Sequence, residues 1–272
     1  MMQYELGFLG AGHMAEAIAK AAIHKGVLQR DQIAASDPSD QRRTVFGQLG
    51  VTTDSDNAAI IGKSKQVLIA VKPQAMGQAA GDLGRHGVAD QVILSIMAGV
   101  SSKKLGQAIA AGHATAKPRV VRVMPNTPLQ IGFGMTGVAL GAHAHRGDED
   151  LAMRLFGAAG KVVLVDESQL DAVTAVSGSG PAYVFYLAEA MQRAAGELGL
   201  SEHADVLVQQ TILGAAQLIA TSENTPETLR RQVTSPGGTT QAAIEHLEKH
   251  HAADVIADAI QAAAQRSIEL GQ

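Results

Sequence analysis

The chain has 272 residues, of which 46% are hydrophobic, and its formal net charge is −4. This length supports one large core or two domains, and the Lys and Arg residues form no basic stripe, so nucleic acid is not an expected partner. The sequence contains no cysteine, which excludes disulfides, thiolate metal sites and a cysteine nucleophile. Because no apolar run could span a bilayer and no secretory pattern opens the sequence, we expect a cytoplasmic protein that does not bind membranes.

The first segment of the chain predicts a nucleotide site. An apolar strand beginning at Tyr4 runs into residues 10–15, Gly-Ala-Gly-His-Met-Ala, and then into a helical pattern. In such a GxGxxA turn, Gly10 permits the tight turn, Gly12 lets the backbone approach a pyrophosphate, and Ala15 lets the helix pack on its strand. The N–H groups and the dipole of the new helix favour a phosphate there. A plain glycine turn is the alternative, but the position in a βαβ pattern favours nucleotide binding.

The second predicted strand, residues 32–37, ends in the acidic residue Asp37. In dinucleotide-binding folds an acid at this position binds the ribose hydroxyls of the adenosine and favours NAD. Neighbouring hydroxyl and guanidinium groups offer an alternative, a site for the 2′-phosphate of NADP. A third interpretation is that residues 37–40 cap the next helix. The neighbours in question are Ser36, Ser39, Arg42 and Arg43.

Further strands and helices alternate along the N-terminal half. The apolar run 67–71 is typical of a strand buried on both faces of a parallel sheet, and it ends at Lys72. Lys72 is explained equally well as a cofactor contact at the end of a strand and as a surface lysine. A strand at 92–97 ends at Ala98-Gly99, and one at 119–124 ends in a stiff loop with two prolines and Asn126. We expect the last two strands, 137–140 and 161–165, at the sheet edge.

After Val165 the strand patterns stop and the remaining segments predict helices. We therefore expect two domains: an α/β dinucleotide-binding domain with a Rossmann-type parallel sheet at 1–165, and an all-α domain at 166–272. Pro181 suits the first turn of a helix whose aromatic residues we expect in a core. These are Tyr183, Phe185 and Tyr186.

The helical segment 205–220 is apolar nearly all the way round, so it must be buried on every side. A helical domain of about a hundred residues has trouble surrounding such a helix by itself. We therefore expect an intertwined homodimer, in which a second subunit completes this core.

A second anion site is predicted at residues 235–240, Ser-Pro-Gly-Gly-Thr-Thr, just before another helix. Backbone N–H groups and hydroxyl donors at such a helix start suit a carboxylate. An ordinary capped helix after a Pro-Gly turn is the alternative. The companion site at the glycine loop favours the anion site, because a dinucleotide-dependent oxidoreductase needs one site for pyrophosphate and one for a small anion.

These residues carry a resemblance to a known family. Residues 235–240, with Leu229 before them and Ala243, Ile244, Leu247 and Glu248 after them, resemble the signature of pyrroline-5-carboxylate reductase, the last enzyme of proline biosynthesis. Residues 7–15, 124–128 and 176–183 agree in the family's order, so the resemblance spans the whole chain. It implies a Rossmann domain, a helical dimerisation domain, an active site at the dimer interface and, in many members, larger rings of dimers.

The resemblance also implies roles for individual residues, with NADPH as the cofactor and NADH as an alternative. The implied cofactor-site residues are Leu9, Gly10, Ala11, Gly12, His13, Met14, Ser36, Asp37, Asn57, Ala70, Val71, Lys72, Pro73 and Ala98. The implied substrate-site residues are Glu223, Gln232, Val233, Ser235, Gly237, Gly238 and Thr239, and the catalytic residue is Thr240. Some relatives carry Asn in place of His13 or Gln232, and some carry Ser in place of Asp37.

The implied reaction is hydride transfer from the nicotinamide to the imine carbon of pyrroline-5-carboxylate. A protonated imine is already an electrophile, so the protein mainly has to position it, with Thr240 donating a hydrogen bond to the ring nitrogen. We expect the helix starts at Gly12 and Thr240 to face each other across one cleft.

Two rival functions remain open at the level of sequence. A β-hydroxyacid dehydrogenase has the same two-domain plan but needs a general base, usually a lysine on the long helix after the boundary, and residues 171–191 contain none. A non-catalytic NAD(P) sensor is the other rival. Two histidine pairs have spacings that metals use, but exposed histidines are the better interpretation. These pairs are His246 with His250, and His143 with His145.

Overall fold

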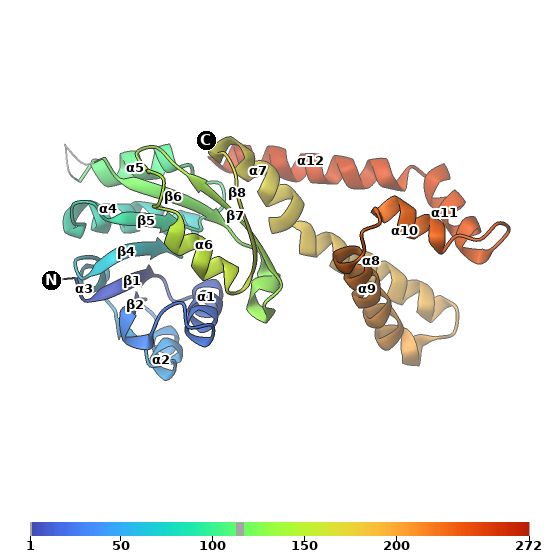
Figure 1. The fold of residues 1–272 in the computed structure, drawn as a ribbon, viewed down its shortest axis with the longest axis horizontal. Helices are drawn as coiled ribbons and strands as arrows, with labels where there is room; N and C mark the ends of the chain where they lie inside the picture. The colour runs from blue at the N-terminus through green and yellow to red at the C-terminus, as the bar shows by residue number, and fades with distance from the viewer. Residues whose placement is uncertain (1, 113–116, 272) are drawn as a thin grey trace. The chain divides into compact units, whose positions relative to one another are not determined.

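A computed structural model describes residues 2–112 and 117–271 of the chain. The chain divides into two compact units. The first contains the residues up to Ser179 together with those from Ala263 onward, and the second is Gly180–Ala262. The strands belong to the first unit, whereas helices make up the second (Figure 1). The predicted fold class, a Rossmann-type α/β domain followed by an all-α region, is confirmed.

The described residues of the first unit form one eight-stranded sheet in the order β3-β2-β1-β4-β5-β6-β7-β8. Neighbouring strands are parallel, except that β6 and β7 pair antiparallel. The chain leaves β1 toward one edge and then crosses to β4 on the other side, so β1 marks the switch point where open α/β sheets bind ligands. The strands are β1 (Tyr4–Leu9), β2 (Ile33–Ser36), β3 (Thr52–Asp54), β4 (Ser64–Ile69), β5 (Val92–Ser95), β6 (Arg119–Met124), β7 (Gly134–Leu140) and β8 (Gly160–Leu164).

The position expected for β7 was wrong. The apolar patterns predict both final strands at the sheet edge, but β7 lies between β6 and β8. The short loop after β6 lets the chain fold back on itself, so β7 pairs antiparallel with β6, and only β8 is left at the edge.

Helices cover both faces of the sheet, and alternate side chains of each strand point to opposite faces. Phe8 belongs to a core under α1, α2 and α6, where its ring meets Phe46 edge to face at 5.9 Å, whereas the next residue, Leu9, belongs to a core under α4 and α5. Both side chains are fully buried, and burial of each contributes about 1.5–3 kcal/mol. The helices of this unit are α1 (His13–His24), α2 (Asp40–Gln48), α3 (Asn57–Ile61), α4 (Met76–His86), α5 (Ser102–Ala110), α6 (Asp150–Gly157) and α7 (Leu170–Val173).

The second unit consists of helices with large exposed apolar side chains. Its helices are α8 (Gly180–Glu197), α9 (Ala204–Thr221), α10 (Pro226–Gln232), α11 (Thr239–Lys249) and the first part of α12 (Ala252–Gly271). Of the α8 aromatic residues expected in a core, Phe185 is 60% and Tyr186 is 76% exposed in the single chain. On α9, Val206, Leu213 and Ile219 are exposed as well. None of the helices in the described parts of the chain is long and apolar enough to cross a membrane.

Candidate cofactor and substrate sites

The glycine loop after β1 has the shape that a pyrophosphate needs. Gly10 has φ +96°, and a Cβ there would lie 3.0 Å from the carbonyl oxygen of Ala70, so glycine is required. Gly12 is the N-cap of α1 but has no side chain with which to cap it, and a Cβ built on Gly12 meets no atom within 4 Å. The start of a twelve-residue helix is therefore open to an anion. The loop fits a bound dinucleotide, whose phosphates these backbone N–H groups would hold.

Strand register brings the predicted cofactor residues together. Leu9 pairs with Ser36 in β2 and with Ile69 in β4, and Ile69 pairs with Ser95 in β5. Because parallel strands end at the same edge, the residues that follow them lie side by side. The predicted residues at this edge are Leu9, Gly10, Ala11, Gly12, His13 and Met14 after β1, Ser36 and Asp37 at β2, Ala70, Val71, Lys72 and Pro73 after β4, and Ala98 after β5.

A small hollow lies beside the loop and includes four of these residues. Its volume is about 340 Å³. Met14, Ala70, Val71 and exposed Lys72 line it together with Ile96, the loop Met124–Thr127 and Gly178. The hollow therefore joins the ends of β1, β4, β5 and β6, and it is apolar apart from Lys72 and the polar loop residues.

Ser36 and Asn57, two predicted cofactor residues, are engaged inside the protein. The buried Ser36 hydroxyl lies 2.6 Å from the side-chain oxygen of Asn57, and the Asn57 amide donates to Asp82 at 2.7 Å. These bonds tie the end of β2 to α3 and α4. The polar groups of the Ser36 and Asn57 side chains therefore hold the edge of the sheet in place.

Asp37 accepts hydrogen bonds from the glycine loop and from the start of α2. One carboxylate oxygen accepts the N–H of Ala11 at 2.8 Å, and the other accepts the N–H of Ser39 at 2.9 Å. The helix-cap interpretation is correct for Ser39, which is the N-cap of α2 and accepts the N–H of Arg42. Asp37 is thus part of the loop geometry itself.

Arg42 and Glu16 join α2 to α1 beside this loop. Arg42 donates to the carbonyl oxygen of Ala11 at 2.6 Å and pairs with Glu16 at 2.7 Å. The pKa of Glu16 is lowered, chiefly by its hydrogen bond with Lys20, while burial acts in the opposite direction and Arg42 adds to the lowering. Glu16 therefore holds Arg42 against the loop as a carboxylate.

Asn126 has a structural role that the sequence analysis missed. It is 8% exposed, its amide donates to the carbonyl oxygen of Ser177 at 3.0 Å, and its oxygen accepts the N–H of Met135 at 2.9 Å. It thereby links the loop after β6, the start of β7 and a π-helix, Thr174–Gly178, whose last residue lines the small hollow. The two prolines that flank this loop were the available signal, but the partners lie far away in sequence.

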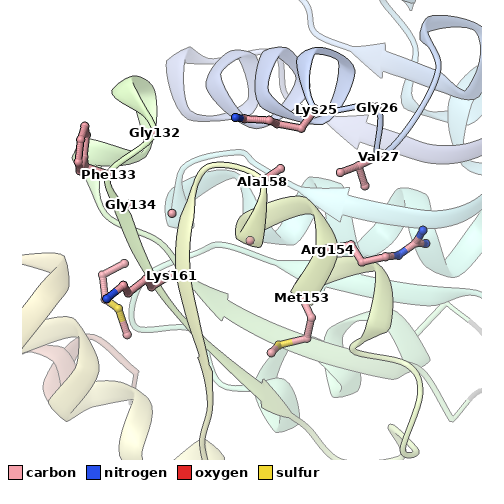
Figure 2. A pocket seen from close by; sticks show the side chains of 13 residues that line it. Lys25, Gly26, Val27, Gly132, Phe133, Gly134, Met153, Arg154, Ala158 and Lys161 are labelled. Atoms are coloured by element: carbon pink, nitrogen blue, oxygen red, sulfur yellow. The ribbon is translucent and has the colours of Figure 1, made fainter. Parts of the chain in front are cut away.

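A second, larger hollow of about 1040 Å³ contains none of the predicted site residues. Figure 2 shows its lining residues coming from the end of α1, the turn before β7, the end of α6 and the start of β8. Lys25 caps the C-terminus of α1 and Arg154 lies in the last turn of α6, where cations complement exposed carbonyl groups. The open N-terminus of α1, at the glycine loop, is the better phosphate site.

The predicted substrate residues lie in the second unit, around the start of α11. Gly237 has φ +71°, and its N–H donates to the Gln241 side chain at 2.7 Å. Gly238 is the N-cap of α11 without a side-chain cap, and a Cβ there would lie 2.5 Å from the Ser235 hydroxyl. Thr240 and Gly238 are partly buried, whereas Glu223, Gln232, Val233, Ser235, Gly237 and Thr239 are exposed. The motif thus forms a helix start with backbone and hydroxyl donors, as the sequence predicts.

The predicted histidine pairs are exposed side chains. His143, His145, His246 and His250 all lie on the surface. In the described residues no group of three or more metal-ligating side chains gathers in one place.

Models of known families match segments in both halves of the chain. Residues 167–270 match a family model described as pyrroline-5-carboxylate reductase dimerisation, and residues 5–99 match one described as NADP oxidoreductase, coenzyme F420-dependent. A pyrroline-5-carboxylate reductase from Pisum sativum is 39% identical over 98% of this chain and 96% of its own. One from Haemophilus influenzae is 39% identical over 99% and 98%, respectively.

Solved structures lead to the same family. A pyrroline-5-carboxylate reductase from Coxiella burnetii superposes with a TM-score of 0.89 at 34% identity, covering 99% of each chain. A Plasmodium falciparum pyrroline carboxylate reductase with NADP bound has a TM-score of 0.87 at 27% identity, covering 100% of each chain. The resemblance seen in the sequence motifs is confirmed. The chain therefore belongs to the pyrroline-5-carboxylate reductase family, whose members are NAD(P)H-dependent oxidoreductases.

Proposed function

We propose that this chain reduces 1-pyrroline-5-carboxylate to L-proline, the last step of proline biosynthesis, with NADPH as the cofactor and NADH as an alternative. The observation that carries the proposal is the pair of uncapped helix starts, Gly12 before α1 and Gly238 before α11, in a chain of this family. Each presents backbone N–H groups to an anion, one to a pyrophosphate and the other to a small carboxylate.

In this proposal the backbone N–H groups from Gly12 to Met14 would hold the pyrophosphate, because those of Gly10 and Ala11 bond to Ser36 and Asp37. Lys72, at the small hollow, would contact the cofactor. NADPH supplies a hydride when it is bound. The remaining predicted residues of the sheet edge shape the site, and Asp37 and Arg42 hold the loop that contacts the cofactor. The absence of Cβ at Gly12 leaves the backbone accessible, which supports this assignment.

The substrate residues act by position and hydrogen bonding. Within the segment Ser235 to Thr239, we assign the hydroxyls and the N–H groups at the start of α11 to the carboxylate of the imino acid, and we assign the Thr240 hydroxyl to its ring nitrogen. Because a protonated imine needs no further activation, orientation supplies most of the required rate enhancement. We propose that Glu223, Gln232 and Val233 complete the substrate site.

We propose a homodimer through the helical region, in which each active site uses both subunits, with rings of dimers as the larger assembly. The dimerisation model that matches residues 167–270 and the exposed side chains of α8 and α9 support it. Large exposed apolar patches on soluble proteins mark interaction sites, and many large apolar side chains of these two helices are exposed. In functional terms, residues 1–165 serve the cofactor and 166–272 the substrate and the partner subunit. The proposed location is the cytoplasm.

A coupled test addresses activity and assembly together. The purified full chain should oxidise NADPH or NADH only when 1-pyrroline-5-carboxylate is added, and it should sediment as a dimer or a multiple of one. Dinucleotide binding without substrate-dependent oxidation would support the sensor instead. A folded, active monomer at low concentration would refute the shared active site.

A further inference from the structure

The end of β2 carries a negative charge that the proposed cofactor site must accommodate. Asp37 follows Ser36, which pairs with Leu9 at the end of β1, so the carboxylate lies against the glycine loop. Its two oxygens accept N–H groups from Ala11 and Ser39 at 2.8 and 2.9 Å. An ionised carboxylate has roughly four acceptor positions, so Asp37 can accept two more hydrogen bonds. Ribose hydroxyls are donors of the right kind.

The cationic groups near Asp37 are already paired with other acceptors. Arg42 bonds to the carbonyl oxygen of Ala11 and to the Glu16 carboxylate. Arg43 donates to the main-chain oxygen of Asp37 at 2.6 Å and pairs with the side chain of Asp40. A guanidinium has five N–H donors, so a 2′-phosphate would have to share these two groups with carboxylates that neutralise their charge and repel the phosphate.

The hydroxyl groups are committed in the same way. The Ser36 hydroxyl is buried and bonded within the protein, at 2.6 Å from the Asn57 side chain. The Ser39 hydroxyl oxygen accepts the N–H of Arg42 as the cap of α2, although its own hydrogen remains a potential donor. The edge thus presents an incoming phosphate with guanidinium groups already paired with carboxylates, and with the Asp37 carboxylate, which repels it.

We propose that Asp37 determines the dinucleotide selectivity of this chain, shifting it from NADPH toward NADH. Asp37 accepts the ribose hydroxyls of NADH, while its charge opposes the 2′-phosphate, which itself carries a charge of about −1.5 to −2. This inference rests on the proposed cofactor site, and it concerns only the 2′ position of the adenosine ribose.

The test is the ratio of the dissociation constants for NADPH and NADH, measured by titration calorimetry on the full chain without substrate. Wild-type protein should bind both dinucleotides, with a weaker preference for NADPH over NADH than either Asp37 variant shows. Asp37→Ser should move the ratio toward NADPH by on the order of tenfold, the effect of removing one close like charge near a protein surface. Asp37→Asn should move it in the same direction, because it removes the charge but keeps an acceptor for the N–H of Ala11.

The matched control is Asp31→Ser. Asp31 is an exposed acid just before β2, at the opposite end of the strand from Asp37, and this change removes the same charge from the protein. It should leave the ratio unchanged. A substitution that only loosens the loop would weaken both dinucleotides equally and also leave the ratio unchanged.

Three results would overturn the inference. A change smaller than about twofold for both Asp37 variants would remove the role of the carboxylate. A shift of Asp31→Ser equal to that of Asp37→Ser would assign the effect to net charge. Failure of the wild-type protein to bind either dinucleotide would overturn the proposed cofactor site and this inference with it, whereas the first two results leave that site intact.

Discussion

Gly10 and Gly12 separate the folding of the glycine loop from its function. Replacing either one with alanine adds a single methyl group, but the two groups meet different surroundings. At Gly10, φ is +96° and the new Cβ would lie 3.0 Å from both the carbonyl oxygen of Ala70 and a methyl of Val71. At Gly12, φ is −68° and the Cβ meets no atom within 4 Å.

The two changes should therefore affect different quantities. Gly10→Ala places a non-glycine residue at positive φ, which lowers the free energy of unfolding by about 1–3 kcal/mol. Gly12→Ala introduces a slightly poorer N-cap, but it also reduces the entropy of the unfolded chain, so its net effect on stability should stay within about 0.5 kcal/mol. The Gly12→Ala methyl group instead occupies the space into which a pyrophosphate must come, and should raise the dissociation constant for NADPH and NADH by about tenfold or more.

Two measurements on each variant separate the effects. Thermal melting at fixed protein concentration reports stability, with a shift of about 2–4 °C per kcal/mol for a domain of this size. Titration calorimetry reports dinucleotide affinity. Wild-type affinity in Gly12→Ala would refute the assignment of the loop to a pyrophosphate. A melting temperature reduced equally in both variants would show that the contrast between the two glycines is misjudged.

Three further predictions concern the substrate site, an ion pair and the assembly. Thr240→Ala should lower kcat by about tenfold or more while leaving NADPH affinity alone, and Thr240→Ser should retain most activity. The control Thr44→Ala, which removes an exposed hydroxyl on α2, should change neither kcat nor NADPH affinity. Unchanged turnover of Thr240→Ala would remove the proposed role of Thr240. Burial raises the pKa of Asp148, but its hydrogen bonds, above all with Arg119, outweigh that and lower it overall. This pair should therefore stabilise the fold above the ordinary aspartate pKa and lose its effect as pH falls through the lowered value. Asp148→Ala should cost about 1.5–3 kcal/mol at neutral pH and progressively less in acid melts; a pH-independent difference would contradict this. Phe185→Asp should reduce the sedimenting mass at micromolar concentration, whereas an unchanged mass would exclude α8 from the subunit interface.

Local signals in the sequence were sufficient to predict which residues lie at the ligand-binding edge of the sheet. Glycine spacing, apolar runs and the rule that ligands bind at the carboxyl ends of parallel strands together placed Gly12, Asp37 and Lys72 at one edge. Each of these inferences depends on a short segment and on a general property of α/β sheets. The structure brings the same residues together.

Contacts between distant segments could not be predicted from the sequence. Asn126 bonds to Ser177 and Met135, and Asp37 bonds to Ala11, across separations that no periodicity reports. The sequence likewise does not show which chain covers the exposed aromatic residues of α8. An apolar side chain looks the same in sequence whether its own chain or a second subunit is expected to bury it.

Hydride transfer itself is the most direct test of the proposed activity. NADPH carrying deuterium at the transferable position of its nicotinamide is incubated with the full chain and 1-pyrroline-5-carboxylate, and the product is examined by mass spectrometry and NMR. We expect L-proline with one deuterium on the former imine carbon, formed in equal amount to the oxidised cofactor. Unlabelled proline, or cofactor oxidation without proline, would contradict it.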